Sequence, residues 1–234
     1  EELQEHLFKL EQLFPNLLFQ SRNKGIQLQF DFQNTLHPRI AIFKQSETYS
    51  FLNQLFIKEW QSLEQMCQVL SINPVQIEEI IQHLNTKLPQ HYGINIQLSP
   101  LCMEGAEEDI RAFYLDYFSQ NYSFLDWPFP SISEESLTNL IQLFLDAQQV
   151  SPNLSSLRQI KYTLAINLER FNKSHLIENP TPLLTSHYST LMQIPQFEQD
   201  IKKLAKKLHF EPKKETLEQL FSNPVKSPQI TNNP

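Results

Sequence analysis

The stretch SLEQMCQVLSINPVQIEEIIQHLNTKL at residues 62–88 decides the fold. Ser62 and Gln65 stand three residues apart, which predicts a capping box and the start of a helix. The tight turn SIN follows. Asn73-Pro74 then predicts the start of a second helix, because asparagine caps helices well and proline is tolerated at the first helical position. Helix, short turn and helix of these lengths are typical of a helix-turn-helix.

The second of these helices is amphipathic and is expected to run to about Leu88. Its apolar residues recur at spacings of three and four, which is typical of a helix with one buried face. The buried stripe is predicted to consist of Ile77, Ile80, Ile81, Leu84 and Leu88. The outward face is predicted to carry Val75, Gln76, Glu79, Gln82, His83 and Thr86. A further helix, TYSFLNQLFIKEW, is expected before the pair.

Two of the three glycines open nearly the same phrase, KGIQLQF at residues 24–30 and YGINIQL at residues 92–98. After the second phrase, SP and LCMEG complete two short strands around Ser99-Pro100, which we interpret as a wing. Each glycine is expected to be the hinge between a recognition helix and its wing, because glycine takes positive φ readily. Two such phrases predict two winged helix-turn-helix units in tandem. The alternative is two unrelated hairpins on a helical protein.

From Glu107 onward the sequence predicts helix after helix. EEDIRAFYLDYFSQNY is amphipathic, and SISEESLTNLIQLFLDAQQV is expected to begin at a capping box of Ser131 and Glu134. A long helix is predicted over NLSSLRQIKYTLAINLERFNKSHLIE, and shorter ones over TPLLTSHYSTLM, FEQDIKKLAKKLHF and KETLEQLF. The predicted fold class is mostly α: winged helix-turn-helix units with short β-hairpin wings, followed by an α-helical bundle.

Composition argues against several classes of protein. Cys67 and Cys102 form no CxxC pattern, so neither a disulfide framework nor a metal site is expected. The sequence has no phosphate-binding glycine loop, no HExxH and no nucleophile elbow, so we expect no enzyme and no cofactor. No run of eighteen uncharged apolar residues occurs, which predicts a cytoplasmic protein without membrane association. The missing initiator Met and the opening EELQEHLFKLEQLF suggest that the N-terminus is absent.

The net charge of −7 is unevenly distributed. Acidic residues concentrate between positions 104 and 146, and basic residues between positions 202 and 214. No region carries the broad basic field that is typical of a strong, sequence-blind nucleic-acid binder.

Several of these segments resemble the Mga family of bacterial virulence and sugar-responsive transcription regulators, related to the RofA-like and AtxA-type proteins. The strongest matches are Leu84-Asn85, the Gly-Ile wing, E-G-x-E-x-x-I-R at residues 104–111, and WPF at residues 127–129. The family is described as having two winged helix-turn-helix units, two helical PTS regulation domains and a C-terminal domain similar to a sugar-phosphotransfer component. The resemblance covers roughly residues 1–200, and implies that this chain is a fragment.

The resemblance implies four segments: residues 1–46, the end of a first winged unit; 47–105, the second winged unit; 106–221, a helical regulatory domain; and 222–234, a flexible tail. It implies a DNA-binding transcriptional regulator, an activator of virulence or sugar-responsive genes, controlled through oligomerisation and histidine phosphorylation. The implied partners are double-stranded DNA, a second copy of the chain and phosphotransferase-system proteins. The alternative is an interaction or dimerisation module that uses the winged fold as a scaffold without binding DNA.

The predicted DNA-binding residues are Arg22, Lys24, Asn73, Gln76, Gln82, His83 and Lys87. Gln82 has the chemistry to pair with adenine in the major groove, and a charged turn before a wing can reach phosphate. Gln76 and Glu79 depart from the Thr and Arg of the family. A carboxylate is repelled by phosphate, although it can accept from cytosine N4. The alternative for all of these residues is an ordinary solvated surface.

The resemblance also implies a histidine phosphorylation site. The family's acceptor would fall near Tyr162-Thr163, where this sequence has no histidine. The nearest candidates for phosphorylation are His175 and His187. The alternative is that both are ordinary histidines with a hydrogen bond.

Overall fold

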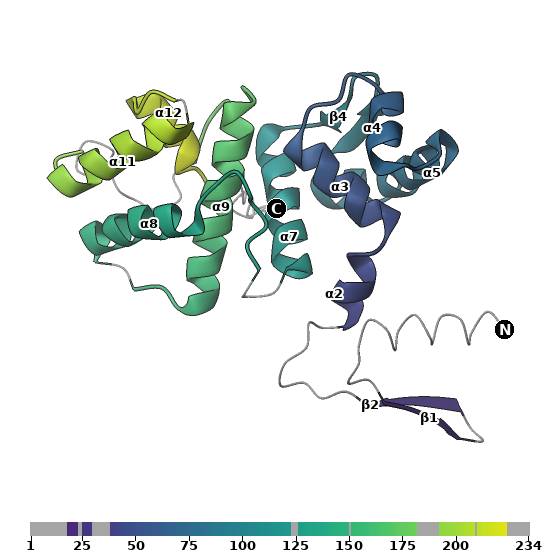
Figure 1. Ribbon diagram of the computed structural model, residues 1–234. Helices are drawn as coiled ribbons and strands as arrows, with labels where there is room; N and C mark the ends of the chain where they lie inside the picture. Colours follow the sequence, from purple (N-terminus) through teal and green to yellow (C-terminus); the bar gives the residue numbers. More distant parts are fainter. Residues whose placement is uncertain are drawn as a thin grey trace, which may run out of the picture. The chain divides into compact units, whose positions relative to one another are not determined.

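A computed structural model of the chain describes residues 18–22, 25–29, 38–122, 126–149, 151–181, 192–208 and 210–223 (Figure 1). The chain divides into two compact units, Glu1–Ser50 and Phe51–Pro234. The predicted mostly α fold class with short hairpins is confirmed.

In the first unit, strands β1 (Leu18–Arg22) and β2 (Gly25–Gln29) form an antiparallel hairpin in which Arg22 pairs with Gly25. Helix α2 (Pro38–Phe43) follows, and α3 (Glu47–Ile57) begins here and continues into the second unit. The expectation that Gly25 is a hinge between a helix and a wing was wrong, because Gly25 opens the second strand of the hairpin. The helix expected over residues 3–14 lies outside the described residues.

The second unit begins with the predicted helix-turn-helix. Helix α4 (Leu63–Leu70) is capped by Ser62, whose side chain accepts from the backbone N–H of Gln65, and α5 (Pro74–Asn85) begins at Asn73 as predicted. Helix α5 ends at Asn85 rather than Leu88. Pro89 explains the difference, because a proline clashes with the carbonyl four residues before it, here that of Asn85. The chain continues as the short helix α6 (Leu88–Tyr92).

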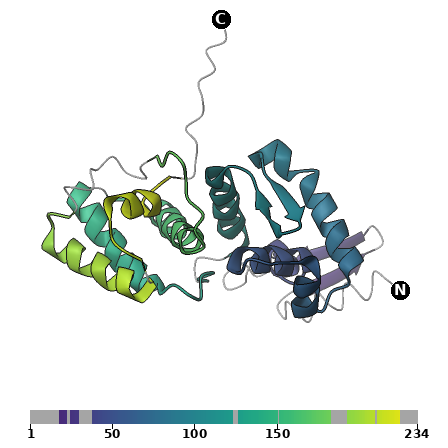
Figure 2. The same cartoon turned by 90° about the horizontal axis from the view of Figure 1, so that it is seen from above.

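The predicted wing is confirmed as strands β3 (Asn95–Leu98) and β4 (Leu101–Glu104), paired antiparallel. Gly93 takes φ +70 at the end of α6, as expected of a hinge. The wing closes at Gly105, where φ is +150 and a Cβ would stand 2.7 Å from Ile94 Cγ2. Figure 2 shows the hairpin of β3 and β4 beside helix α5, with which β3 is in contact. Close approach of two backbone segments therefore requires glycine at position 105.

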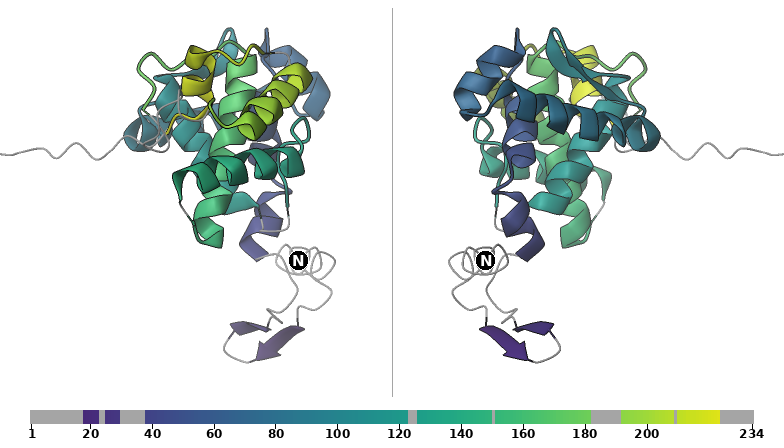
Figure 3. Two further views of the ribbon diagram at one scale, coloured as in Figure 1. Left: turned by 90° about the vertical axis from the view of Figure 1, so that its left-hand side faces the viewer. Right: turned by 90° about the vertical axis from the view of Figure 1, so that its right-hand side faces the viewer.

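The remaining described helices of the unit are α7 (Glu107–Asn121), α8 (Glu134–Gln148), α9 (Leu154–Asn172), α11 (Pro195–Leu208) and α12 (Lys214–Leu220). Helix α9 contacts α7, α8 and α12, and α8 contacts α11, as two further views show (Figure 3). Within the described ranges, no helix combines the length and hydropathy needed to span a lipid bilayer.

Three boundaries differ from those predicted. Ser133 caps α8, since its side chain accepts from the N–H of Ser136, whereas the hydroxyl of the expected cap Ser131 donates to Glu169. Helix α9 ends at Asn172, short of residue 178. Ser222, placed in the tail by the prediction, is buried, and its carbonyl accepts from the Asn167 amide. The helix expected over residues 181–192 lies almost entirely outside the described residues.

An aromatic cluster joins α3 to α7. The ring centroid of Phe56 lies 4.6 Å from that of Tyr114 and 4.9 Å from that of Phe118. Phe118 lies 4.9 Å from Phe129 of the WPF connector. All four side chains are buried, so α7 packs on the winged helix-turn-helix on one side and on α9 on the other.

Gly105→Ala is expected to lower the free energy of unfolding by about 2 kcal/mol or more, because the added methyl would overlap the buried Ile94. Gly93→Ala is the matched control. At position 93 an added Cβ would lie 3.9 Å from its nearest neighbour, Asp109 Oδ2, which is an ordinary contact. The free energy of unfolding should therefore fall by only about 1 kcal/mol, because of the positive φ. Urea unfolding of both variants measures the difference. Equal costs would contradict the account of Gly105.

Candidate nucleic-acid interface and buried polar network

The first turn of α5 positions two of the predicted DNA-binding residues. The Asn73 side chain accepts from the N–H of Val75 at 2.9 Å, and the Gln76 side chain accepts from the N–H of Asn73 at 3.3 Å. This reciprocal pair is a capping box, which satisfies backbone donors at the start of the helix. Both side chains are exposed, but both already have a structural role.

The rest of the outward face of α5 is exposed as predicted. Ile77 and Ile81 are buried, whereas Glu79, Gln82 and His83 face solvent. Within the described part of the chain, Gln82 and His83 make no side-chain hydrogen bond. Lys87 is also exposed, but it lies after the end of α5, at the N-cap of α6.

Asn85 fixes the wing to this helix. Its side-chain carbonyl accepts from the N–H of Ile96 at 2.8 Å, and its amide donates to the carbonyl of Ile96 at 2.9 Å. One side chain thus satisfies both backbone groups of a residue in β3, as a neighbouring strand would. The position of the wing relative to α5 is therefore set by Asn85.

Two predicted contacts come from the first unit. Arg22 is the last residue of β1 and pairs with Gly25, but its side chain is not described. Lys24 lies outside the described residues. Their DNA contacts stay predictions.

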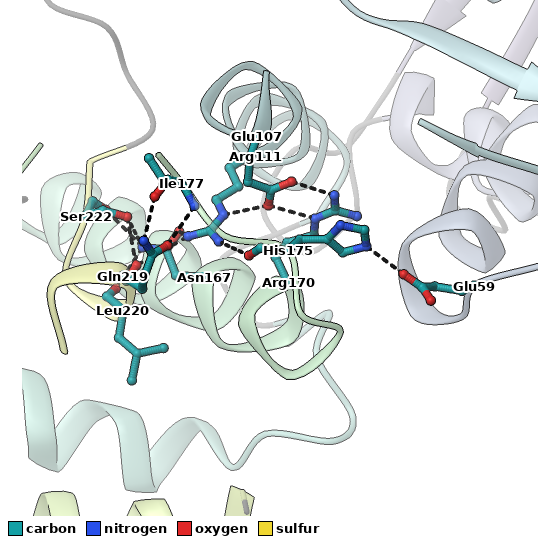
Figure 4. Close-up of polar contacts among 10 residues, drawn as sticks. All are labelled: Glu59, Glu107, Arg111, Asn167, Arg170, His175, Ile177, Gln219, Leu220 and Ser222. Carbon is teal, nitrogen blue, oxygen red and sulfur yellow. Dashed lines mark hydrogen bonds and ion pairs between the residues drawn. The ribbon is translucent and has the colours of Figure 1, made fainter. Parts of the chain in front are cut away.

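A second polar constellation centres on Glu107, in the first turn of α7 (Figure 4). Arg170 of α9 donates to both of its carboxylate oxygens, from Nε at 2.9 Å and from Nη2 at 2.6 Å. Arg111 of α7 donates to Oε1 from Nε at 2.7 Å. Arg111 is fully buried and Arg170 nearly so. One carboxylate therefore compensates two buried guanidinium groups.

The remaining donors of Arg111 reach groups that come later in the chain. They donate to Asn167 Oδ1 at 3.1 Å and to the backbone carbonyls of His175 at 2.8 Å and Gln219 at 3.3 Å. The Asn167 amide donates in turn to the carbonyls of Leu220 at 2.7 Å and Ser222. These bonds hold α12 and the segment after α9 against α7.

The charges of this network shift its pKa values. Burial alone would raise the pKa of Glu107, but the hydrogen bonds and charges of Arg170 and Arg111 outweigh it, so the pKa is lowered. Burial lowers the pKa of Arg111, which shares the carboxylate, while for Arg170 the bidentate pair outweighs burial and raises the pKa. The carboxylate is therefore ionised at neutral pH.

Two side chains after α9 extend the network to the winged helix-turn-helix. Lys173 donates to the carbonyl of Phe56, in the last turn of α3, and its ammonium lies 5.2 Å from the ring centroid of Phe56. His175 Nε2 lies 2.6 Å from Glu59 Oε1. A cation near the carbonyl end of a helix is favourable, and Lys173 supplies one at the end of α3. His175 adds a contact with Glu59, which follows that helix in the chain.

Two family models match the chain on either side of this junction. The Mga helix-turn-helix domain matches residues 29–118, and the PRD domain of the M protein trans-acting positive regulator (MGA) matches residues 133–227. The chain belongs to the Mga family. The predicted family is therefore confirmed, and the two matches correspond to the winged helix-turn-helix with α7 and to the helices from α8 onward.

Curated relatives are named as regulators. A Streptococcus pneumoniae protein described as a candidate trans-acting regulator is 31% identical over 75% of this chain and 36% of its own length. The anthrax toxin expression trans-acting positive regulator of Bacillus anthracis is 28% identical over 76% of the chain and 38% of its own length. The capsule synthesis positive regulator AcpB of Bacillus anthracis is 22% identical over 67% and 33%. The chain spans about a third of the length of these relatives.

The structure describes only one of the two histidines predicted as phosphorylation sites in this Mga-family chain. His175 is half-buried and faces Glu59, and His187 lies outside the described residues. Tyr162 and Thr163, where the family's acceptor was expected, are both buried in α9. Phosphorylation at either histidine stays a prediction.

Reasoning from the sequence did not identify Glu107, Arg111, Asn167 and Arg170 as a network. A signal was present, because Arg111 stands between Ile110 and Phe113 on the buried side of α7 and four residues after Glu107, the spacing of a helical ion pair. Arg170, the other partner of Glu107, lies 63 residues after Glu107 in the chain, and nothing in the sequence indicates that these two residues pair.

Glu107→Gln is expected to destabilise the chain by about 3–5 kcal/mol at pH 7, because it leaves two buried guanidinium groups without a counter-charge. The folded-state pKa of Glu107 is lowered, so its stabilisation is present above the ordinary pKa of 4.5 and lost as pH falls through the lower folded value. The two proteins should therefore converge in stability in acid. Urea unfolding between neutral pH and pH 3 measures this.

Glu135→Gln serves as the control for that comparison. Glu135 is exposed in the first turn of α8, and the expected change is within about 0.5 kcal/mol. A Glu107→Gln variant no less stable than this control would show that the carboxylate does not hold the two arginines.

Proposed function

We propose that this chain is part of a DNA-binding transcriptional regulator, in which α5 enters the major groove and the helices from α8 onward control its activity. The observation that carries the proposal is the exposed outward face of α5 within a helix-turn-helix that the Mga helix-turn-helix domain matches. In such a fold the second helix reads base edges and the wing lies near the backbone.

The proposal gives different roles to the predicted residues. Gln82 is exposed and makes no side-chain hydrogen bond to the residues that the structure describes, so it would pair with adenine, and Lys87 would contact a phosphate. Asn73 and Gln76 lie at the N-terminus of α5, where residues of a recognition helix contact bases, and would exchange their capping bonds for DNA. His83 adds a contact beside Gln82. Arg22 and Lys24 would reach phosphate from the hairpin of the first unit.

The regulatory part of the proposal rests on the polar network. Because Arg111, Lys173 and His175 tie α9 and the segment after it to α7 and α3, a change in the helical domain is transmitted to the winged unit. The relatives are named as positive regulators of toxin expression and capsule synthesis, which supports an activator of virulence genes. A homodimer and contact with phosphotransferase-system proteins belong to the same proposal.

A second candidate function is an interaction or dimerisation module that does not bind DNA. The outward side of α5 carries Glu78 and Glu79, both exposed, and the phosphate backbone repels carboxylates. This observation favours a scaffold role for the second winged unit.

Fluorescence anisotropy of the chain on mixed-sequence duplex DNA, at two salt concentrations, separates the two functions. A DNA reader should lose affinity on Lys87→Ala, and the slope of log K against log salt should fall by about 0.9 for the lost phosphate contact. Gln82→Ala should weaken binding to a preferred duplex by about 5- to 150-fold, corresponding to about 1–3 kcal/mol for one base contact.

Lys206→Ala is the matched control for Lys87→Ala, because Lys206 is an exposed lysine of α11. Equal effects of the two lysine variants would mean that the attraction is non-specific. No salt-sensitive binding, together with a dimer in light scattering, would support the scaffold function instead.

Phosphorylation of His175 would act on the junction with the winged unit. A phosphate on Nε2 would bring close to two negative charges to the position now facing Glu59, so attraction would become repulsion. After treatment with phosphoramidate, ³¹P NMR should show a phosphohistidine signal that His175→Gln removes and Glu59→Gln strengthens. A spectrum unchanged by His175→Gln would exclude this residue, and loss of the signal on His187→Gln would then be needed to support His187 over the exposed His83 and His91.

A further inference from the structure

A small cavity of about 20 Å³ lies between the end of α3, strand β4, helix α7 and the residues at and after the end of α9. Leu101 and Tyr114 line it from the part of the chain that the Mga helix-turn-helix domain matches. Arg170 and Lys173 line it from the part that the PRD domain matches. The cavity has room for about one water molecule or one ion of similar size. Its occupant would therefore contact both matched domains.

The Tyr114 hydroxyl is a polar group that the fold leaves unused at this cavity. Its side chain is fully buried, and the hydroxyl has no hydrogen-bond partner among the described residues. Burial raises the pKa of Tyr114, and the nearby charges of Arg170 and Glu107 act on it in opposite directions, so the hydroxyl keeps its proton at neutral pH. A buried hydroxyl normally bonds to protein, water or ligand. Tyr114 can therefore donate to an occupant of the cavity.

Two cationic side chains at the cavity also keep donors that the fold does not use. Arg170 binds Glu107 through Nε and Nη2, and no bond joins its Nη1 to another described residue (Figure 4). Lys173 donates to the carbonyl of Phe56, which uses one of the three N–H donors of an ammonium group. Tyr114, Arg170 and Lys173 thus offer unused donors to the same small space.

The charge around the cavity is positive. Three cationic side chains line it: Lys58, Arg170 and Lys173. The carboxylate of Glu59 also lines it, and its Oε1 lies 2.6 Å from His175 Nε2. Even when the carboxylate of Glu107 is included, the three cations outnumber the two carboxylates by one. Such a lining repels metal cations and attracts anions.

The unused donors favour an anion over a water molecule. Water must donate as well as accept, and guanidinium and ammonium groups cannot accept a hydrogen bond. An anion accepts from each of these donors and also compensates the surplus positive charge. The volume of about 20 Å³ admits a single atom of about the size of chloride, whereas sulfate and phosphate are several times too large.

We propose that this cavity binds a chloride ion, which accepts hydrogen bonds from Tyr114, Arg170 and Lys173. Because the donors come from α7, α9 and the residue after α9, occupancy stabilises the packing of the winged helix-turn-helix on the helices from α9 onward. The proposal does not require α5 to bind DNA, so a failure of DNA binding leaves it unaffected.

Thermal unfolding in sodium chloride and in sodium gluconate, at equal ionic strength and without DNA, tests the site. Gluconate is too large for the cavity. Chloride at about four times its dissociation constant should raise the unfolding temperature by about 2–4 °C beyond the general effect of the salt. Tyr114→Phe should lose this increment, because it removes the hydroxyl and keeps the ring.

Tyr92→Phe is the matched control, because the Tyr92 hydroxyl donates to Asp116 at the surface. It should keep the chloride increment of the unchanged chain. In gluconate, Tyr114→Phe should unfold at the same temperature as the unchanged chain or above it, since an unpaired buried hydroxyl is gone. The same difference between the two salts in the unchanged chain and in Tyr114→Phe would mean that the cavity holds only water, and would overturn the proposal.

The width of the ³⁵Cl NMR line measures binding of the ion itself. The chain should broaden this line saturably, and bromide should compete. Lys173→Met should weaken the affinity about tenfold or more, because it keeps an unbranched side chain and removes a charged donor. Lys206→Met, at an exposed lysine of α11, should leave the affinity unchanged. Broadening that does not saturate, or equal weakening by both lysine variants, would mean non-specific attraction and contradict the proposal.

Discussion

The second unit depends on one largely buried carboxylate, that of Glu107, which must compensate two buried arginines. Glu107 bonds to Arg111 and Arg170, so the local charge remains positive, and Arg111 still has donors to satisfy. Leaving them unpaired would cost several kcal/mol, so backbone carbonyls and Asn167 must approach. The chain after α9 and at the end of α12 supplies these acceptors. The path of 174–177 and 219–222 follows from this requirement.

Helix α7 therefore packs against two parts of the unit, the winged helix-turn-helix and the helices from α9 onward. Its buried aromatic residues Tyr114 and Phe118 pack on Phe56 of α3, while Glu107 and Arg111 bind α9 and the segments beyond it. A shift of α9 that preserved the buried ion pairs would have to move α7. Such coupling needs no long pathway, because one rigid helix carries both sets of contacts.

Sequence signals between neighbouring residues predicted the winged helix-turn-helix well. They could not predict contacts between residues that are far apart in the sequence. Asn73-Pro74 marks the start of α5 because capping depends only on neighbouring residues. Pro89 was equally visible, and its effect on residue 85 explains why α5 ends early. At Ser131 a capping-box pattern was present but unused, because Ser133 caps α8 and the Ser131 hydroxyl donates to the distant Glu169. The pair of Glu107 with Arg170 has no local pattern at all.

The side chains on the outward face of α5 limit how strongly this helix could attract the phosphate backbone in the proposed DNA complex. The bond from the Asn73 N–H to Gln76 is 3.3 Å long and exposed, so giving it up costs little, about 1 kcal/mol or less. The face can therefore rearrange to read bases, but Glu78 and Glu79 add repulsion, and Lys87 is a single cation. In the proposed DNA complex, attraction to the phosphate backbone would then come from outside this helix, and α5 would contribute selectivity rather than affinity.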